Sequence, residues 1–344
     1  MPENKFQINA SYKLGGGIAL FLIILVLSIY SIILNWKIEC SNPERLITIP
    51  KGASAQAVAQ LLKSEACLQN ESIFKLALTM TMKNKRIIPG RYNFKGISSI
   101  SQVVNMITSH SRDRIRVTLI EGWSVEQFAD ELVQKLQIDQ YKFMQLNKDF
   151  NFIHSLGIDA PALEGFLFPD TYILLKTYAE EDIIKIMANQ FKYKMDQLKQ
   201  GESLNSNLNM REITTLASII QGEAIHEDEM PIISSVYHNR LRRGMLLQAD
   251  PTIQYIIPGK ARRLYNKDLK VDNPYNTYKY KGLPPGPINN PGLAALAAAA
   301  NPTETDYLYF VSNGEGRHIF SRTNEEHNQA KLKMKRKRHA KKKI

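Results

Sequence analysis

The chain has 344 residues, which is long enough for two or three domains with separate hydrophobic cores. Hydrophobic residues make up 44% and charged residues 23%, an ordinary globular composition that excludes wholesale disorder. The formal net charge of +12 is mostly local, because residues 331–344 contain nine Lys or Arg and no acid. We therefore expect a basic C-terminal tail rather than a basic surface on the fold, and no specific nucleic-acid partner.

A long apolar run lies near the start of the chain. Between Lys13 and Lys37 there are 23 uncharged residues, enough to cross a hydrocarbon layer of about 30 Å as a helix. The run is longer than the apolar part of a typical signal peptide, and no small-residue cleavage site follows it. We predict a transmembrane helix over 14–36 that crosses the inner membrane once. Residues 1–13 would be cytoplasmic and the remainder periplasmic, although the flanking charges favour this orientation only weakly.

Two stretches beyond the apolar run resemble each other at an offset of 70 residues, ITIPKGASAQAVAQLL (47–62) and VTLIEGWSVEQFADEL (117–132). Each predicts a short strand, a glycine turn, a serine N-cap and an amphipathic helix. Ser124 and Gln127 also have the spacing of a capping box. A duplication and shared local sequence preferences explain the resemblance equally well.

The chain as a whole predicts an α+β fold. A compact α+β subdomain is expected over 45–110, with a Pro-Gly turn at its centre, and a larger mixed α/β domain over 115–330. The two cysteines, Cys40 and Cys67, are compatible with a disulfide and equally with two separate thiols. Periodicity predicts helices in 124–137, 139–149, 179–199, 211–225 and the run LAALAAAA, and strands at Thr252–Tyr255 and Tyr307–Val311.

The predicted helix over 211–225 ends among acidic residues. Glu223 falls at the edge of its apolar stripe, where partial desolvation raises the pKa of a carboxyl and keeps it protonated near neutrality. A general acid that cleaves glycosidic bonds needs this property. An ordinary Glu at a helix margin is the simpler interpretation of periodicity alone. We expect His226 and the acids that follow it to form a solvated helix end.

A metal site is not expected. Glu223 and His226 have the i, i+3 spacing of a di-iron helix, but the second such pair, Glu315 and His318, lies in a glycine-rich turn. No pattern of zinc ligands is present in the sequence. The sequence therefore predicts no metal and no cofactor.

Further polar residues are candidates for binding a substrate. Glu164 lies in ALEGFLFPDTY, where aromatic rings beside carboxylates are typical of sugar sites and also of ordinary cores. The other candidates are polar residues interleaved with turn formers, and each alone is a modest indication: Asn239, Arg240, Gln248, Asp250, Asn276 and Tyr278.

Taken in order, five motifs resemble those of the endolytic murein transglycosylases, the MltG or YceG-like family. They are LEGFLFPDTY, LASIIQGEA, VYHNRLRRGMLLQADPTIQY, NPYNTYKYKGLPPGPINNPG and YLYFVSNGEGRHIFSRTNEEHN. The resemblance covers roughly residues 45–330, and a single N-terminal anchor fits it. It implies a LysM-like, peptidoglycan-binding subdomain over 45–110 and a YceG-like catalytic domain over 115–330.

The resemblance also implies an activity. The expected enzyme is a lyase that cuts nascent glycan strands between N-acetylmuramic acid and N-acetylglucosamine and leaves 1,6-anhydro ends. The family's catalytic glutamate lies in Ala-Ser-Ile-x-x-x-Glu, which places it at Glu223; some members have Glu where this chain has Gln221. The implied partners are glycan strands, the inner membrane and peptidoglycan synthases. An alternative of another class is a non-catalytic membrane anchor that binds the cell wall.

Overall fold

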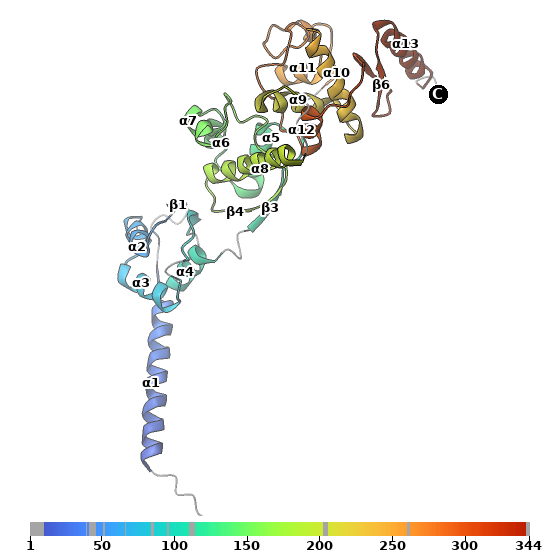
Figure 1. The fold of residues 1–344 in the computed structure, drawn as a ribbon. Coiled ribbons are helices and arrows are strands. Elements are labelled where there is room, and N and C mark those ends of the chain that lie inside the picture. Colours follow the sequence, from blue (N-terminus) through green and yellow to red (C-terminus); the bar gives the residue numbers. More distant parts are fainter. Residues whose placement is uncertain are drawn as a thin grey trace, which may run out of the picture. The chain divides into compact units, whose positions relative to one another are not determined.

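The structure is a computed structural model of the full chain. The chain divides into two compact units, Met1–Arg114 with Leu175–Ala179, and Ile115–Leu174 with Glu180–Ile344 (Figure 1). The residues whose structure is described are 10–38, 40, 46–50, 52–65, 67–83, 86–94, 96–109, 114–201, 206–259 and 262–341.

The first unit packs short helices around a two-stranded antiparallel sheet. Ile47 of β1 lies opposite Tyr92 of β2, and both side chains are buried. Ser54 accepts a hydrogen bond from Ala57 N and so begins α2 at the predicted N-cap. The elements are α1 (Ala10–Leu34), β1 (Leu46–Ile49), α2 (Ala55–Ser64), α3 (Glu71–Met80), β2 (Gly90–Asn93) and α4 (Ile100–Thr108).

The end of α1 is fastened to this unit. Ile33 and Leu34 pack against its hydrophobic core, and Ile100 N donates to the carbonyl of Trp36. Cys40 and Cys67 form a disulfide, which answers the question that the sequence left open. The chain that follows α1 is therefore held by apolar packing, backbone hydrogen bonds and a covalent link.

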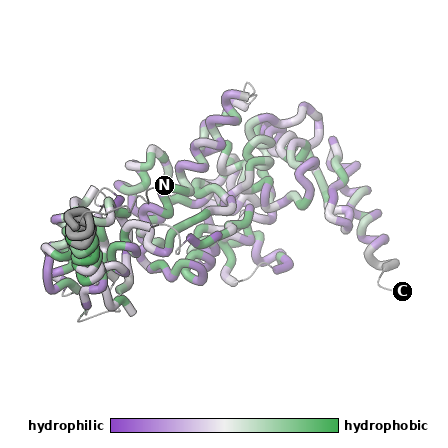
Figure 2. The backbone as a smooth tube through the Cα atoms, turned by 90° about the horizontal axis from the view of Figure 1, so that it is seen from below, coloured by the Kyte–Doolittle hydropathy of each residue, from purple (hydrophilic) through white to green (hydrophobic). Residues whose placement is uncertain are grey.

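The apolar run forms α1, whose large side chains between Ile18 and Ile32 are exposed. Figure 2 shows this helix almost end on, with hydrophobic residues beyond its grey part. Among the helices of the described residues, none is both long enough and apolar enough to cross a membrane. The predicted span over 14–36 is therefore not shown by the structure.

The second unit is mostly helical, with two small sheets. β3 pairs with β4, and β5 and β6 form an antiparallel hairpin in which Phe310 lies opposite Phe320. The elements are β3 (Arg114–Thr118), α5 (Val125–Leu136), α6 (Gln140–Leu146), α7 (Phe150–Ser155), β4 (Thr171–Leu175), α8 (Glu180–Gly201), α9 (Met210–Glu223), η1 (Glu227–Glu229), α10 (Met230–Arg242), α11 (Asp250–Ile256), η2 (Asp268–Lys270), α12 (Leu293–Ala300), β5 (Tyr309–Ser312), β6 (His318–Ser321) and α13 (Asn324–Lys341). The α+β class is confirmed, and the larger domain has less strand than a mixed α/β domain.

Helix α9 lies at the centre of the second unit. Every residue from Ile213 to Ile220 is buried, so α9 is enclosed on all sides rather than along one stripe. The alanine-rich α12 packs against α9 and α10, because side chains of one carbon let helix axes approach closely. α9 therefore provides a rigid support for the residue at its end.

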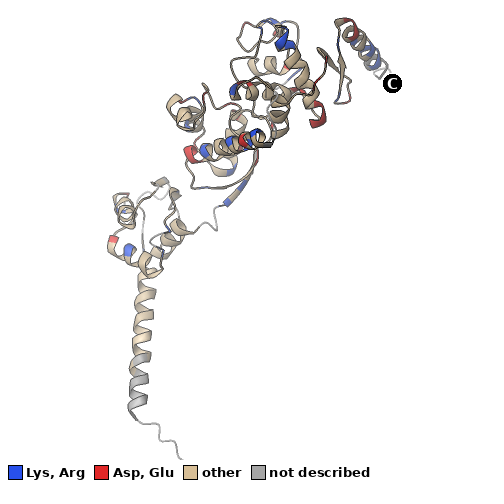
Figure 3. Cartoon of the chain, viewed as in Figure 1, with Lys and Arg blue, Asp and Glu red and all other residues tan. Residues whose placement is uncertain are grey.

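One sequence prediction needs correction. Residues 252–255 form part of α11 rather than a strand, because Asp250-Pro251 begins a helix and proline is favoured in the first turn. The basic tail expected over 331–344 belongs, as far as it is described, to α13, which begins earlier at Asn324. Figure 3 shows the basic residues along this helix in blue. The strand expected at 307–311 is confirmed approximately, as β5.

Candidate active site

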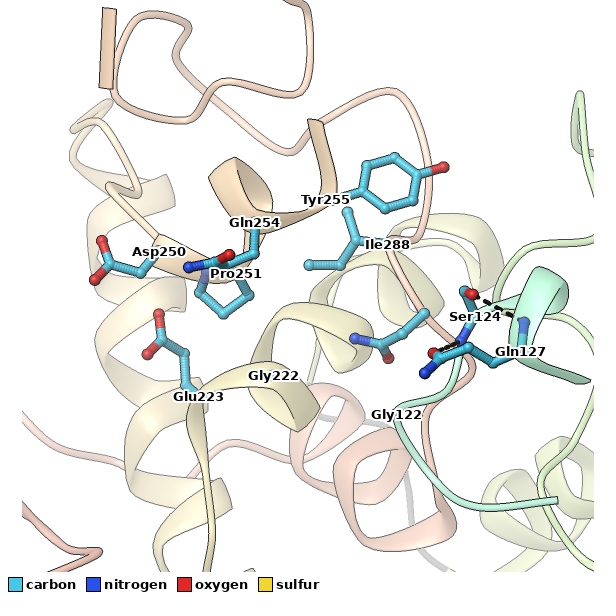
Figure 4. A pocket seen from close by; sticks show the side chains of 11 residues that line it. Gly122, Ser124, Gln127, Gly222, Glu223, Asp250, Pro251, Gln254, Tyr255 and Ile288 are labelled. Carbon is cyan, nitrogen blue, oxygen red and sulfur yellow. Dashed lines mark hydrogen bonds between the residues drawn. The ribbon is translucent and has the colours of Figure 1, made fainter. Parts of the chain in front are cut away.

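A cavity of about 390 Å³ opens beside the end of α9. At one end of it the carboxylates of Glu223 and Asp250 lie next to each other, and Ser124, Gln127 and Tyr255 lie toward the other end (Figure 4). The cavity is lined by Gly122, Ser124, Gln127, Gly222, Glu223, Asp250, Pro251, Gln254, Tyr255, Ile288 and Asn289. A cavity lined by both polar and apolar side chains is typical of a site for a small ligand.

The sequence of α9 places Glu223 at the edge of this cavity. The helix begins with a capping box in which Asn209 and Glu212 satisfy each other's backbone N–H groups. It ends at Glu223, because Ala224 has an extended backbone. The side chain of Glu223 is therefore only half-buried, although the eight residues from Ile213 to Ile220 are enclosed.

Gly222 allows α11 to approach α9 closely. A Cβ atom added at Gly222 would lie 2.7 Å from the Pro251 Cβ, which is closer than non-bonded carbons come. Any larger residue at this position would push α11 away from α9. The glycine therefore sets the distance between Glu223, which follows it, and Asp250, which precedes the proline.

Each of the two carboxylates is held by a tyrosine. The Tyr237 hydroxyl donates to Glu223 Oε1 at 3.0 Å, and the Tyr278 hydroxyl donates to Asp250 Oδ1 at 2.5 Å. Burial is the first cause that raises the pKa of each phenol, so both tyrosines remain donors at neutral pH. The carboxylates therefore have fixed positions, and one oxygen of Glu223 remains free of the tyrosine.

The surroundings of Glu223 favour its protonated form. Burial raises its pKa to about 7, and the negative charge of Asp250 acts in the same direction. The hydrogen bond from Tyr237, a backbone hydrogen bond from Asp250 and the positive charge of Arg240 offset part of this increase. Near pH 7 Glu223 can therefore give a proton and take one back, as a general acid–base group does.

Two residues predicted to bind substrate instead hold the protein together. The guanidinium of Arg240 donates to the carbonyls of Leu247 and Leu308 at 2.6 and 2.7 Å, and it is almost fully buried. The amide of Asn239 donates to the carbonyls of Thr305 and Tyr307 at 2.8 and 2.9 Å. Both side chains connect α10 to the chain before β5, and neither lines the cavity.

Gln248, Asn276 and Tyr278 also lie outside the cavity lining. Asn276 is fully buried and donates to the carbonyls of Leu269 and Val271, so it organises its own loop. Gln248 is exposed, has a left-handed backbone with φ of 49°, and bonds Thr277 O through its backbone N–H. Of the residues predicted from the sequence, only Glu223 and Asp250 line the cavity. Tyr278 contributes by holding Asp250.

Glu164 lies behind the cavity wall. Its two carboxyl oxygens accept from Val125 N at 3.1 and 3.3 Å, and one of them also accepts from the amide of Asn290. Burial raises its pKa to about 8, and Glu126 adds to the increase. The carboxyl thus caps α5, whose first turn carries two cavity residues, Ser124 and Gln127. Glu164 therefore acts on the cavity through α5.

Several residues important to the site were not singled out from the sequence. Tyr237 and the pair Asn289-Asn290 lie inside two of the family motifs. Their polar side chains within these motifs are the sequence feature that could have identified them. Asn290 is fully buried, and its amide bonds Gly165, Leu167, Trp123 and Glu164. A buried amide with this many partners fixes the surrounding loops relative to one another.

Gln221 and the acids beyond α9 also have structural roles. Gln221 Oε1 accepts from Gly292 N at 3.0 Å, which ties α9 to the start of α12. Glu229 is only 6% exposed and bonds His318 Nδ1 at 3.0 Å, and Asp228 pairs with Arg317. The expectation of a solvated helix end is therefore wrong for Glu229, because the β5–β6 hairpin packs there, whereas Asp228 is exposed as expected. Within the described residues, no group of His, Cys, Asp and Glu is arranged to hold a metal ion.

Comparison with known proteins identifies the family. The model of the YceG-like family matches residues 47–333, which is most of the chain. The chain belongs to the YceG-like family. The resemblance inferred from the motifs is confirmed.

Two curated proteins are similar to this chain over most of its length. An endolytic murein transglycosylase of Bacillus subtilis is 34% identical over 304 residues, which cover 83% of this chain and 84% of that protein. One from Streptococcus pneumoniae is 27% identical over 83% of this chain, and the match spans 58% of its own length. The curated relatives are thus lytic transglycosylases, and the pneumococcal one is considerably longer.

A solved structure supports the fold. A YceG-like protein of Listeria monocytogenes has a crystal structure that is 31% identical in sequence, with a TM-score of 0.55. The match covers 84% of this chain and 99% of that one. The mostly helical α+β architecture is therefore shared within the YceG-like family.

Proposed function

We propose that this protein is a membrane-anchored, endolytic lytic transglycosylase that cuts nascent peptidoglycan strands between N-acetylmuramic acid and N-acetylglucosamine. The observation that carries the proposal is Glu223. It is a half-buried carboxyl at the edge of a cavity, with a pKa raised to about 7 by burial and by Asp250. The names of the curated relatives agree with it. Cutting would end or size strands during wall synthesis.

In the first step Glu223 gives its proton to the glycosidic oxygen. The Tyr237 hydroxyl donates to Oε1 and so holds the carboxyl at the edge of the cavity. The bond between C1 of the muramoyl residue and this oxygen breaks, and positive charge develops at C1. The carboxylate of Asp250, on the same side of the cavity, would stabilise that charge electrostatically.

In the second step the Glu223 carboxylate takes the proton from the C6 hydroxyl of the same muramoyl residue. The hydroxyl oxygen then bonds to C1 and closes the 1,6-anhydro ring. Glu223 is protonated again at the end, and no water is consumed. One acid–base group is therefore sufficient, whereas hydrolysis by two carboxylates needs a second group to activate water.

The location of the enzyme is also part of the proposal. A single membrane anchor is supported by the uncharged run over 14–36 and by the exposed apolar side chains of α1. The catalytic domain would then lie on the periplasmic side of the inner membrane, where the cell wall is. We assign residues 45–110 to a LysM-like, peptidoglycan-binding subdomain. We also propose that peptidoglycan synthases are partners of the protein. Membrane fractionation with alkaline extraction tests the anchor, and release of the full-length chain into the soluble fraction would refute it.

Digestion of purified glycan strands tests the activity. Mass spectrometry separates the two cleavage reactions, because an anhydro end is lighter than a reducing end by one water. The proposal predicts internal fragments that end in anhydro-muramic acid. Retained binding without such fragments would instead support the non-catalytic, wall-binding anchor.

A further inference from the structure

The chain around the cavity contains a basic and aromatic segment, residues 255–281, here called the basic loop. It holds seven Lys or Arg, two Asp and five Tyr. The net charge of the whole chain does not indicate this segment, because the C-terminal tail accounts for most of the excess of basic over acidic residues. The expectation that the fold has no basic surface is therefore incomplete.

Most of the positive charge of the basic loop faces solvent. Asp268 pairs with Arg262 and Asp272 pairs with Lys279, so the two acids of the loop are already used. Four further cations are exposed, and no ion pair joins them to an acid in the described part of the chain: Arg263, Lys267, Lys270 and Lys281. Exposed cations without acidic partners attract anionic groups of a ligand.

Exposed tyrosines alternate with these cations. Tyr255, Tyr265 and Tyr280 are 42%, 57% and 46% exposed. Aromatic faces stack on the C–H faces of sugar rings, and tyrosine and arginine are enriched where proteins bind partners. Cations and exposed rings along one segment therefore fit a polymer that has both sugar rings and negative charges.

The described residues of the basic loop, 255–259 and 262–281, are attached to the cavity wall. The side chain of Gln254, a cavity residue, bonds both the backbone N–H and the carbonyl of Arg262. Tyr255 also lines the cavity and packs on Tyr275 with ring centroids 5.0 Å apart. The buried amide of Asn276 holds the carbonyls of Leu269 and Val271. A part of the ligand that leaves the cavity beside Gln254 and Tyr255 would therefore contact the basic loop directly.

We propose that the basic loop binds the stem peptides of the glycan strand next to the bond that is cut, through their carboxylates. An enzyme that cuts inside a strand must accommodate chain on both sides of the bond, and a cavity of about 390 Å³ holds only a short piece of it. The muramoyl residues of the strand carry peptides with free carboxylates, which match the exposed cations. The proposal rests on the proposed function and specifies its substrate as peptide-bearing strands.

The test compares two substrates and two triple variants. The first variant combines Arg263→Ala, Lys267→Ala and Lys270→Ala. The matched control removes three exposed lysines elsewhere in the same unit, with Lys148→Ala, Lys185→Ala and Lys199→Ala. The substrates are glycan strands with intact stem peptides and the same strands after an amidase has removed the peptides.

We expect the loop variant to raise KM for peptide-bearing strands on the order of tenfold at low salt, because several charge contacts are lost together. The kcat should stay within about twofold, since no catalytic group is changed. KM for stripped strands, and KM of the control variant on both substrates, should also stay within about twofold. An equal rise of KM on both substrates, or no rise, would overturn the proposal.

A binding measurement separates this inference from the proposed activity. Each triple variant is combined with Glu223→Gln and sedimented with insoluble peptidoglycan at increasing salt. The inference expects weaker binding and a flatter salt dependence for the loop variant only. If the unaltered protein produces no anhydro ends, the proposed activity fails whatever the binding shows. If it cuts strands and both variants bind and cut alike, only the inference about the loop fails.

Discussion

The hydroxyl of Tyr237 donates a 3.0 Å hydrogen bond to the carboxyl of Glu223 and so joins α10 to the last residue of α9. The ring of Tyr237 is buried and packs edge-on against Phe310 of β5 at 5.9 Å. The position of the candidate acid therefore depends on three elements. Changes at Tyr237 and at the neighbouring Asp250 should move the pKa of Glu223 in opposite directions.

Replacing Glu223 with Gln should remove the activity. The amide is similar in shape but cannot exchange a proton with the glycosidic oxygen, so we expect a loss of about a thousandfold or more in kcat. The appearance of anhydro ends measures the change. Thermal unfolding should show a midpoint within a few degrees of the unaltered protein. Full activity in this variant would exclude Glu223 as the acid.

Tyr237→Phe should shift the pH profile upward. The hydrogen bond from Tyr237 lowers the pKa of Glu223, so its removal raises that pKa by on the order of 1 unit. Because the first step needs protonated Glu223, kcat/KM should then fall at a higher pH than in the unaltered protein. Tyr193→Phe, on the distant α8, is the control and should leave the profile unchanged. A downward shift would contradict the assignment.

Asp250→Asn should shift the same limb downward. The negative charge of Asp250 raises the pKa of Glu223, so a neutral amide should lower it by about 1 unit. We also expect kcat to fall about 10- to 100-fold, because positive charge at C1 loses a stabilising carboxylate. Tyr278→Phe keeps the charge and removes only the hydrogen bond to Asp250, so its shift should be smaller. Equal shifts of the pH profile in the two variants would show that the position of the Asp250 carboxylate, rather than its charge, controls the pKa of Glu223.

Glu164→Gln should change how stability depends on pH. Burial raises the pKa of folded Glu164 to about 8 from an ordinary value of 4.5, so the folded state binds more protons than the unfolded state between these values. The free energy of unfolding contributed by this group is therefore lost as pH rises from about 4.5 to 8.

The neutral glutamine can still accept from Val125 N and avoids this loss. Urea unfolding across this pH range measures the free energy of unfolding of both proteins. Relative to the unaltered protein, that of the variant should rise with pH, by up to a few kcal/mol at pH 8. Glu304→Gln, at an exposed site, is the control. A pH dependence identical to that of the unaltered protein would show that Glu164 is ionised without cost in the fold.

Breaking the disulfide should affect the first unit alone. Cys40 and Cys67 are 27 residues apart, and closing a loop of this size stabilises a fold by about 3 to 4 kcal/mol in the chain-entropy description. Cys40→Ser combined with Cys67→Ser should lower the unfolding midpoint of that unit. Cleavage of soluble strands should remain, because the cavity lies in the other unit. An unfolding curve that does not respond to reductant would contradict the prediction.

Local structure followed from the sequence because it depends on residues close together in the chain. The strand, turn and capped helix near Ser54 and near Ser124 were predicted from spacing and are present. The prediction failed at 252–255, where β-branched and aromatic residues favoured a strand. There the helix start at Asp250-Pro251 and packing against Gly222 outweighed that preference.

By itself the sequence determined the α+β class, the ordered motifs of the family and Glu223 as the candidate acid. Only the tertiary structure decided which polar residues accompany it. It placed Asp250 and Tyr237 beside Glu223. The side chains of Arg240, Asn239 and Asn276 instead donate hydrogen bonds to backbone carbonyls outside the cavity. The physical reason is that a polar residue in a motif can face either the cavity or the interior. Which one it faces depends on contacts between segments far apart in the chain.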